Sequence, residues 1–184
     1  MSESAKESSP ERPLIHITTR HERSLYTLII HAITRPFQSH LGRPKEKQPE
    51  GSVALSPPKS TKKKTFVEHH TVCDINVYDI RAKTSKAADC KKRIYYFGGG
   101  GWQSPPSVQH WKLCMRMARD VPGVTVTLVY YPLAPNNPAA VSFPWLMRFY
   151  RTIMRAADEA GERIILSGDS SGGNVVLSLV LEAL

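Results

Sequence analysis

Three short apolar runs limit most strongly how this chain of 184 residues can fold. They occupy residues 93–97, 125–130 and 163–167, and they lack polar alternation at their centres. Runs of this kind are typical of parallel strands that helices cover on both faces. Upstream of them, residues 66–80 alternate between apolar and polar side chains, which predicts one or two further strands.

Segments with helical spacing separate these runs. In residues 107–119 the apolar side chains recur on one face, and the pattern stops before Pro122-Gly123. In residues 144–160 a second pattern begins at Pro144 and ends before Gly161, positions that proline and glycine favour at the two ends of a helix. Strand and helix therefore alternate, and we predict an α/β fold with a mostly parallel sheet and flanking helices.

The first third of the chain has a different composition. We expect a disordered tail over residues 1–23, an amphipathic helix over 24–40, a basic linker rich in Pro and Lys over 41–65, and the α/β domain over 66–184. The helix is too short to span a bilayer, and we favour its docking on the protein over contact with a membrane surface. With no secretory signal or transmembrane segment, we expect the chain in the cytoplasm or at the periphery of a membrane.

The net charge of +9 invites comparison with nucleic-acid-binding proteins, but its distribution argues against that class. Residues 1–65 carry +6 of the charge, whereas residues 95–184 carry +1. The run Lys62–Lys64 has no interleaved aromatic residues to stack on bases, so we interpret it as a solvated loop. Three widely spaced cysteines without a C-x-x-C pair predict neither a disulfide framework nor a metal site.

The segment Gly168-Asp169-Ser170-Ser171-Gly172-Gly173 lies between the third apolar run and an apolar helical segment. A G-x-S-x-G motif in that context predicts a nucleophile elbow, a sharp turn that presents the serine hydroxyl at a helix N-terminus. The N–H groups and the dipole of the helix favour negative charge on oxygen there. A plain tight turn or a phosphate-binding loop would share the motif, but the loop lacks the Lys of a P-loop. Ser170 is therefore the candidate nucleophile.

A second glycine-rich segment, Gly98–Gly101, follows the first apolar run. Consecutive glycines at the end of a strand allow several backbone N–H groups to point toward one place, as an oxyanion hole requires. A flexible loop is the alternative interpretation. The position of this segment one strand–helix–strand–helix–strand unit before the elbow favours the oxyanion hole, because α/β-hydrolases place the partner loop there.

Together the runs IYYFGGGGW, YYPLAPNNPAA and GDSSGGN resemble the hormone-sensitive-lipase branch of the α/β-hydrolases, and more closely its fungal esterases similar to steryl acetyl hydrolase. The resemblance covers about residues 66–184. It implies that Ser170 is the nucleophile, that the N–H groups of Gly99, Gly100 and Ser171 form the oxyanion hole, and that no cofactor is needed. It also implies a small-molecule ester substrate, such as a lipid or sterol ester, and it matches the helix at 24–40 to the cap segment over the active site.

The sequence departs from the family pattern at two motifs. Gly98 stands where the family usually has a histidine, and Tyr130-Tyr131-Pro132 stands where it usually has Asp-Tyr-Arg. Tyr131 and the following Leu133-Ala134-Pro135 still match the family's loop before the helix that precedes the elbow. The rigidity of the glycine loop is the property that these two departures affect.

The catalytic base presents a larger departure. In α/β-hydrolases the acid and the histidine follow the serine in the chain, yet after Ser170 this sequence has no histidine and one acid, Glu182. His110 is the nearest histidine upstream, and we expect it to have a surface or packing role. We therefore expect weak or no turnover from this polypeptide, and we interpret it as the N-terminal portion of a longer hydrolase, with an open sheet edge at residues 163–167. An inactive binding or interaction module is the alternative.

Overall fold

The computed structural model describes residues 24–37, 48–85 and 90–184. The chain divides into two compact units, Met1–Arg43 and Pro44–Leu184. In the first unit, helix α1 (Leu25–Thr34) continues into a short 3₁₀ helix, η1 (Arg35–Phe37). Of the predicted helix over 24–40, residues 25–37 are helical, and residues 38–40 lie outside the described residues together with the tail over 1–23. Each unit is considered by itself.

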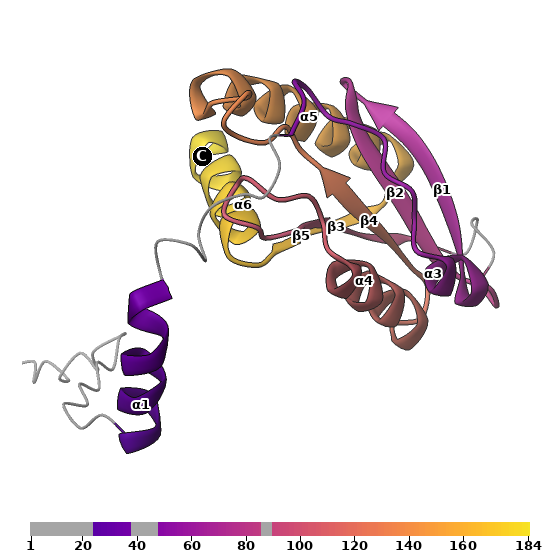
Figure 1. Ribbon diagram of the computed structural model, residues 1–184. Helices are drawn as coiled ribbons and strands as arrows, with labels where there is room; N and C mark the ends of the chain where they lie inside the picture. Colours follow the sequence, from indigo (N-terminus) through magenta and orange to yellow (C-terminus); the bar gives the residue numbers. More distant parts are fainter. Residues whose placement is uncertain (1–23, 38–47, 86–89) are drawn as a thin grey trace, which may run out of the picture. The chain divides into compact units, whose positions relative to one another are not determined.

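The second unit is built on a five-stranded sheet with the strand order β1-β2-β4-β3-β5 (Figure 1). Strand β2 is antiparallel to β1 and β4, and β3 is parallel to β4 and β5, so four of the five strands share one direction. The strands are β1 (Thr65–Val72), β2 (Ile75–Ala82), β3 (Lys92–Phe97), β4 (Val124–Tyr130) and β5 (Arg163–Gly168). The predicted α/β fold with a mostly parallel sheet is confirmed.

The alternating segment at 66–80 forms the β1–β2 hairpin. Cys73 and Asp74 form its two-residue turn, with φ angles of 49° and 60°. Two consecutive residues with positive φ are the signature of a type I′ turn, whose twist matches that of the flanking strands. The two predicted strands are therefore one antiparallel pair.

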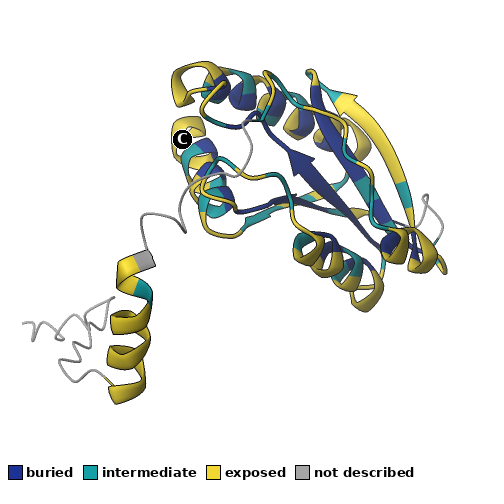
Figure 2. Cartoon of the chain, viewed as in Figure 1, coloured by how far each residue is buried: buried dark blue, intermediate teal, exposed yellow. Residues whose placement is uncertain are grey.

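Helices cover both faces of the sheet, as Figure 1 shows. The ring of Trp111 on α4 packs edge-on against Tyr78 of β2, and on the other face Phe149 of α5 packs edge-on against Tyr95 and Phe97 of β3. Figure 2 shows the buried residues concentrated in the central strands and on the inner faces of these helices. The helices of this unit are α3 (Lys59–Lys64), α4 (Val108–Asp120), α5 (Ala139–Ala160) and α6 (Ser171–Ala183).

Helix α5 begins five residues earlier than the sequence predicted. Its N-cap is Pro138, and Pro144 lies inside the helix instead of at its start. A proline at that position removes one hydrogen bond of the helix. Burial of Leu146, Phe149 and Ile153 against the sheet offsets this loss, which is why the local proline signal did not mark the boundary.

Part of the predicted linker at 41–65 packs against the sheet. Residues 41–47 lie outside the described residues, but the N–H of Gly51 donates to Asn137 Oδ1 (2.8 Å) and the Ser52 hydroxyl donates to the Tyr130 carbonyl (2.5 Å). The polar, proline-rich composition indicated solvent exposure. It did not reveal that these polar groups pair with the end of β4 and the loop after it.

The β5 end of the sheet carries exposed apolar side chains. Ile165 on β5 and Leu177 and Leu181 on α6 are all more than half exposed. In the part of the chain that the structure describes, β5 is the last strand in the order, as expected for an open edge.

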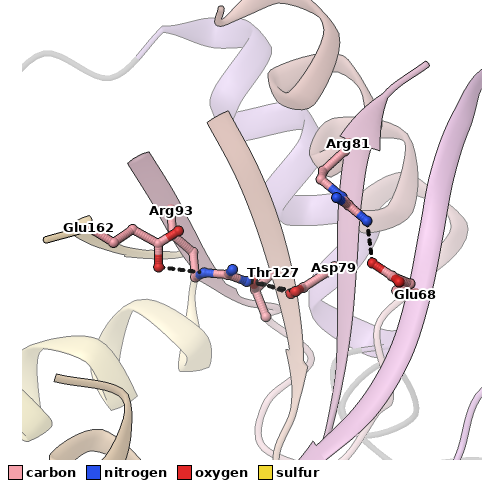
Figure 3. Close-up of polar contacts among 6 residues, drawn as sticks. All are labelled: Glu68, Asp79, Arg81, Arg93, Thr127 and Glu162. Carbon is pink, nitrogen blue, oxygen red and sulfur yellow. Dashed lines mark hydrogen bonds and ion pairs between the residues drawn. The ribbon is translucent and has the colours of Figure 1, made fainter. Parts of the chain in front are cut away.

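A charged cluster ties together four elements on the α5 face of the sheet (Figure 3). The Arg93 guanidinium on β3 donates to Asp79 Oδ2 on β2 (2.7 Å) and to Glu162 Oε2 before β5 (3.0 Å), and Thr127 on β4 donates to Asp79 Oδ1 (2.6 Å). Burial alone would lower the pKa of Arg93, but the two carboxylates raise it above its usual value. The Arg93 guanidinium therefore stays positively charged although it lies in a mostly apolar layer.

Replacing Arg93 by Met should destabilise the fold by about 2–3 kcal/mol, because Asp79 and Glu162 would stay partly buried without their cation. The side chains of Arg93 and Asp79 are 21% and 13% exposed, so the cost is lower than for a fully buried pair. Arg116→Met is the matched control, since its pair with Asp120 is 80% and 58% exposed and should contribute less than about 1 kcal/mol. Urea denaturation of both variants measures the difference, and equal losses would contradict the role given to the cluster.

Candidate active site

The candidate nucleophile lies in the turn between β5 and α6. β5 ends at Gly168, and Ser170 is the N-cap residue of α6 with φ 50° and ψ −121°. A residue other than glycine rarely adopts this backbone conformation, which costs about 1–3 kcal/mol and is found where a site requires it. Ser170 is exposed, so its hydroxyl is open to a substrate.

The two glycines of the G-x-S-x-G motif allow α6 to cross very close to the strand ends. A Cβ atom on Gly172 would lie 2.0 Å from the carbonyl oxygen of Phe97, and one on Gly168 would lie 2.6 Å from the backbone carbon of Gly172. Both obstacles are backbone atoms, which cannot turn aside. Close packing therefore requires glycine at both positions of the motif, in addition to the requirement of the sharp turn.

The glycine loop leaves the sheet beside the elbow. Phe97 at the end of β3 is paired in register with Gly168 at the end of β5, so the segments that follow the two strands start next to each other (Figure 1). At Gly100 the φ angle is 151°, and a Cβ atom there would lie 2.6 Å from the Ser104 carbonyl oxygen. This position accepts only glycine.

Asp169 connects the elbow with the glycine loop. Its Oδ1 accepts hydrogen bonds from the Tyr96 hydroxyl (2.7 Å) and from the Gly99 N–H (2.8 Å), and it lies 3.4 Å from His110 Nε2. Burial alone would raise the pKa of this carboxyl, but the Tyr96 and Gly99 hydrogen bonds and the nearby His110 hold it below its usual value. The residue before the candidate nucleophile is thus a charged acceptor for three groups, which lie on β3, the glycine loop and α4.

His110 has the packing role that was one of the two expected for it, since its ring is largely buried. The sequence did not indicate that its Nε2 lies 3.4 Å from Asp169 beside the elbow. Its Nδ1 accepts the Ser107 N–H (2.9 Å) in a capping box at the start of α4, which leaves Nε2 as the protonated nitrogen. Both ring nitrogens have partners, so His110 is not free to take a proton from Ser170.

The place of His110 also bears on the unusual Gly98. A Cβ atom on Gly98 would lie 3.4 Å from His110 Nδ1, so the imidazole of α4 lies against the loop where a side chain at position 98 would begin. Two sequence signals could have indicated this contact. One is the capping-box spacing of Ser107 and His110, and the other is the missing side chain at position 98.

Tyr131 joins the loop that precedes α5 to the same site. Its hydroxyl donates to the Gly98 carbonyl (2.8 Å) and lies 3.4 Å from Ser171 Oγ, and burial raises its pKa above the usual value. The indole N–H of Trp102 donates to the Pro132 carbonyl (3.2 Å), and the Ala134 N–H donates to the Trp102 carbonyl (2.8 Å). These bonds bring together the three motifs that are far apart in the sequence.

The three predicted oxyanion donors have different partners. The Gly99 N–H is bound to Asp169, whereas the N–H groups of Gly100 and Ser171 have no acceptor among the residues that the structure describes. Gly100 and Ser171 therefore have the N–H groups that are available to a new acceptor.

Two surface hollows lie away from this turn. One, of about 560 Å³, is formed on α5 by residues that include Arg148, Arg151 and Arg155. The other, of about 350 Å³, is lined by Arg93, Glu162 and neighbouring residues between the sheet and α5. Neither is lined by a residue of the elbow or of the glycine loop. Over residues 24–37, 48–85 and 90–184 no group of His, Cys, Asp and Glu has the arrangement of a metal site.

Comparison with known proteins shows what the second half of the chain is similar to. Residues 94–184 match the family model described as the alpha/beta hydrolase fold. Mouse hormone-sensitive lipase is 28% identical over 108 residues, which cover 57% of this chain and 14% of the lipase. The gibberellin receptor GID1 of rice is 32% identical over 99 residues, which cover 49% of this chain and 27% of the receptor.

Solved structures give the same result. The hormone-sensitive-lipase homologue EstE7 from a metagenome library is 27% identical with a TM-score of 0.54, covering 66% of this chain and 40% of that protein. Carboxyl esterase 2 of the mycorrhizal fungus Tuber melanosporum shares the fold at 18% identity, with a TM-score of 0.60 and coverage of 88% and 53%. The chain thus spans about half or less of the proteins that it matches.

The close approach at Gly172 leads to a stability prediction. Gly172→Ala should cost about 3 kcal/mol, because the added methyl group meets a backbone oxygen and α6 must move away from β3. Gly173→Ala is the matched control on the same turn, since its nearest atom would lie 3.3 Å away, and it should change stability by less than about 1 kcal/mol. Urea denaturation compares the two variants. A loss of equal size in both would contradict the packing explanation.

The Tyr96 hydrogen bond should set the titration of Asp169. Because the pKa of the folded carboxyl is lowered, its contribution to stability is present above the unfolded pKa of about 3.9 and is lost as the pH falls through the folded value. Tyr96→Phe should raise the folded pKa and reduce this pH dependence, whereas Tyr150→Phe, on α5, should not. Carbon-13 NMR of the Asp169 carboxyl during a pH titration measures the change. An unaltered midpoint in Tyr96→Phe would rule out this cause.

Proposed function

Because residues 94–184 belong to the α/β-hydrolase fold family, on its hormone-sensitive-lipase-like branch, we propose that the protein is a carboxylic-ester hydrolase with Ser170 as its nucleophile. The observation that carries the proposal is the strained backbone of Ser170 at the N-terminus of α6, beside a glycine loop that leaves the neighbouring strand. The esterases and lipases among its relatives make an ester substrate the natural choice. A lipid or sterol ester is the substrate class that we favour.

The chemistry begins with attack of Ser170 Oγ on the carbonyl carbon of the ester. The carbonyl oxygen becomes an oxyanion, the alcohol leaves, and water then hydrolyses the acyl-enzyme. We assign the oxyanion to the N–H groups of Gly100 and Ser171, with support from the positive end of the α6 dipole. Gly99 is the third donor of this proposed hole, and it becomes available when the carboxylate of Asp169, which is about half exposed, turns away from it.

The base is the part of the mechanism that this chain does not supply. Ser170 needs an acceptor for its proton, and His110 is engaged at both nitrogens by Ser107 and Asp169. The sequence after Ser170 contains no histidine. We therefore propose that the 184-residue chain alone turns over only weakly, because a serine hydroxyl without a base is a poor nucleophile.

Binding without turnover is the second candidate function. The similarity to a protein named as a gibberellin receptor favours it. In that case the glycine loop and the elbow would recognise a small carbonyl or carboxylate compound without forming an acyl-enzyme. Catalysis predicts a role for the Ser170 hydroxyl that binding alone does not require.

Hydrolysis of p-nitrophenyl acetate tests the proposal. The chain should exceed the background rate, and Ser170→Ala should return it to background, because the hydroxyl is the group that forms the acyl-enzyme. Ser178→Ala, on the same helix about two turns from its start, is the matched control and should keep the rate of the unmodified chain. Equal rates from the chain and from Ser170→Ala would reject catalysis by this polypeptide.

A further inference from the structure

Helix α1 exposes an apolar surface that its own unit does not cover. None of its residues is buried, and its six large apolar side chains are all exposed, namely Leu25, Tyr26, Leu28, Ile29, Ile30 and Ile33. At about 100° per residue these side chains spread over more than half of the helix circumference. The remaining arc holds Thr27, His31 and Thr34. The helix is therefore amphipathic, with a broad apolar face and a narrow polar one.

The charges around α1 are almost all positive. The helix itself contains no acidic residue. In the sequence, Arg20 and Arg23 precede it, Arg35 follows it in η1, and Glu22 is the single acid between Pro13 and Lys45. A partner of negative charge would complement both ends of the helix.

The length of α1 determines how it could meet a bilayer. Ten residues in a helix extend about 15 Å, which is half of the roughly 30 Å hydrocarbon core, so the helix cannot cross it. In the described parts of the chain, no other helix has the length and the apolar run that crossing a bilayer requires. An orientation in the plane of the surface would place the apolar arc among the acyl chains and the polar arc toward water.

A second copy of the chain fits this surface less well. Helix pairs associate through a narrow seam of two positions in seven, sustained over at least three or four heptads. Helix α1 covers fewer than two heptads, and its apolar arc is much wider than such a seam. A fluid apolar layer can cover the whole arc, which a single partner helix cannot do.

In place of the docking on the protein that the sequence favoured, we propose that α1 is an interfacial helix that binds the surface of an anionic lipid bilayer, with its apolar arc inserted and its flanking arginines on the headgroups. The apolar insertion and the cationic flanks are two separate contributions, as stable interfacial binding usually requires. This inference rests on residues of the first unit and does not depend on the activity of Ser170. It would bring the chain to the place where lipid esters are found.

Co-sedimentation of the full chain with vesicles tests the proposal. Binding should be several-fold stronger to phosphatidylcholine vesicles that contain about 30% phosphatidylserine than to phosphatidylcholine alone, and salt should weaken it. Ile29→Glu should reduce binding at least about tenfold, because it places a charge in the inserted arc. Leu177→Glu on α6 is the matched control, since Ile29 and Leu177 are each 58% exposed, and it should bind as the unmodified chain does.

Three results would overturn the proposal. They are equal binding to both kinds of vesicle, equal loss in Ile29→Glu and Leu177→Glu, and a concentration-dependent dimer in sedimentation velocity that Ile29→Glu abolishes. The last would assign the apolar arc to a second copy of the chain. Because both substituted side chains are exposed, circular dichroism should show the same helix content in both variants, which separates loss of binding from loss of folding. Ser170→Ala should bind the vesicles as the unmodified chain does, so this proposal and that of the Ser170 nucleophile can fail independently.

Discussion

The contact between the first turn of α6 and the end of β3 is the constraint on which the candidate site depends. Gly172 lies so close to the Phe97 carbonyl that no side chain fits between them. This approach places the N-terminus of α6 over the ends of two parallel strands, and Ser170 adopts its strained conformation in the same turn. The register of β3 and β5 brings the glycine loop beside that turn, so the backbone contact and the register together position the candidate site.

Asp169 holds the segments around the elbow together through its hydrogen bonds. Its carboxylate collects donors from Tyr96, Gly99 and His110, and so it holds the glycine loop and α4 against the elbow. The same bond occupies the N–H of Gly99, which an oxyanion would also need. The bond that holds the loop therefore makes the Gly99 N–H unavailable to another acceptor. The N–H groups of Gly100 and Ser171 have no acceptor among the described residues.

The periodic elements were predictable because their signals are local. The apolar runs that became β3, β4 and β5 and the spacing that became α4 follow from which side chains must avoid water, and the structure places all four close to the predicted bounds. The start of α5 was not predictable in this way, since burial of Leu146 and Phe149 outweighed the signal from Pro144. The stretch at 48–64 was missed for a related reason, because its polar groups pair with residues such as Tyr130 and Asn137, which are far away in the sequence.

The sequence by itself determined the α/β fold, the order of the motifs and the identity of Ser170 as the candidate nucleophile, because these depend on residue type, spacing and backbone freedom. Only the tertiary structure decided which groups meet at that serine. His110 has an ordinary place in its helix, yet the packing of α4 against β2 and β4 brings its ring to Asp169 and Gly98. Such a meeting depends on the register of parallel strands and on the close approach of backbone atoms, and neither can be read from the distance between residues along the chain.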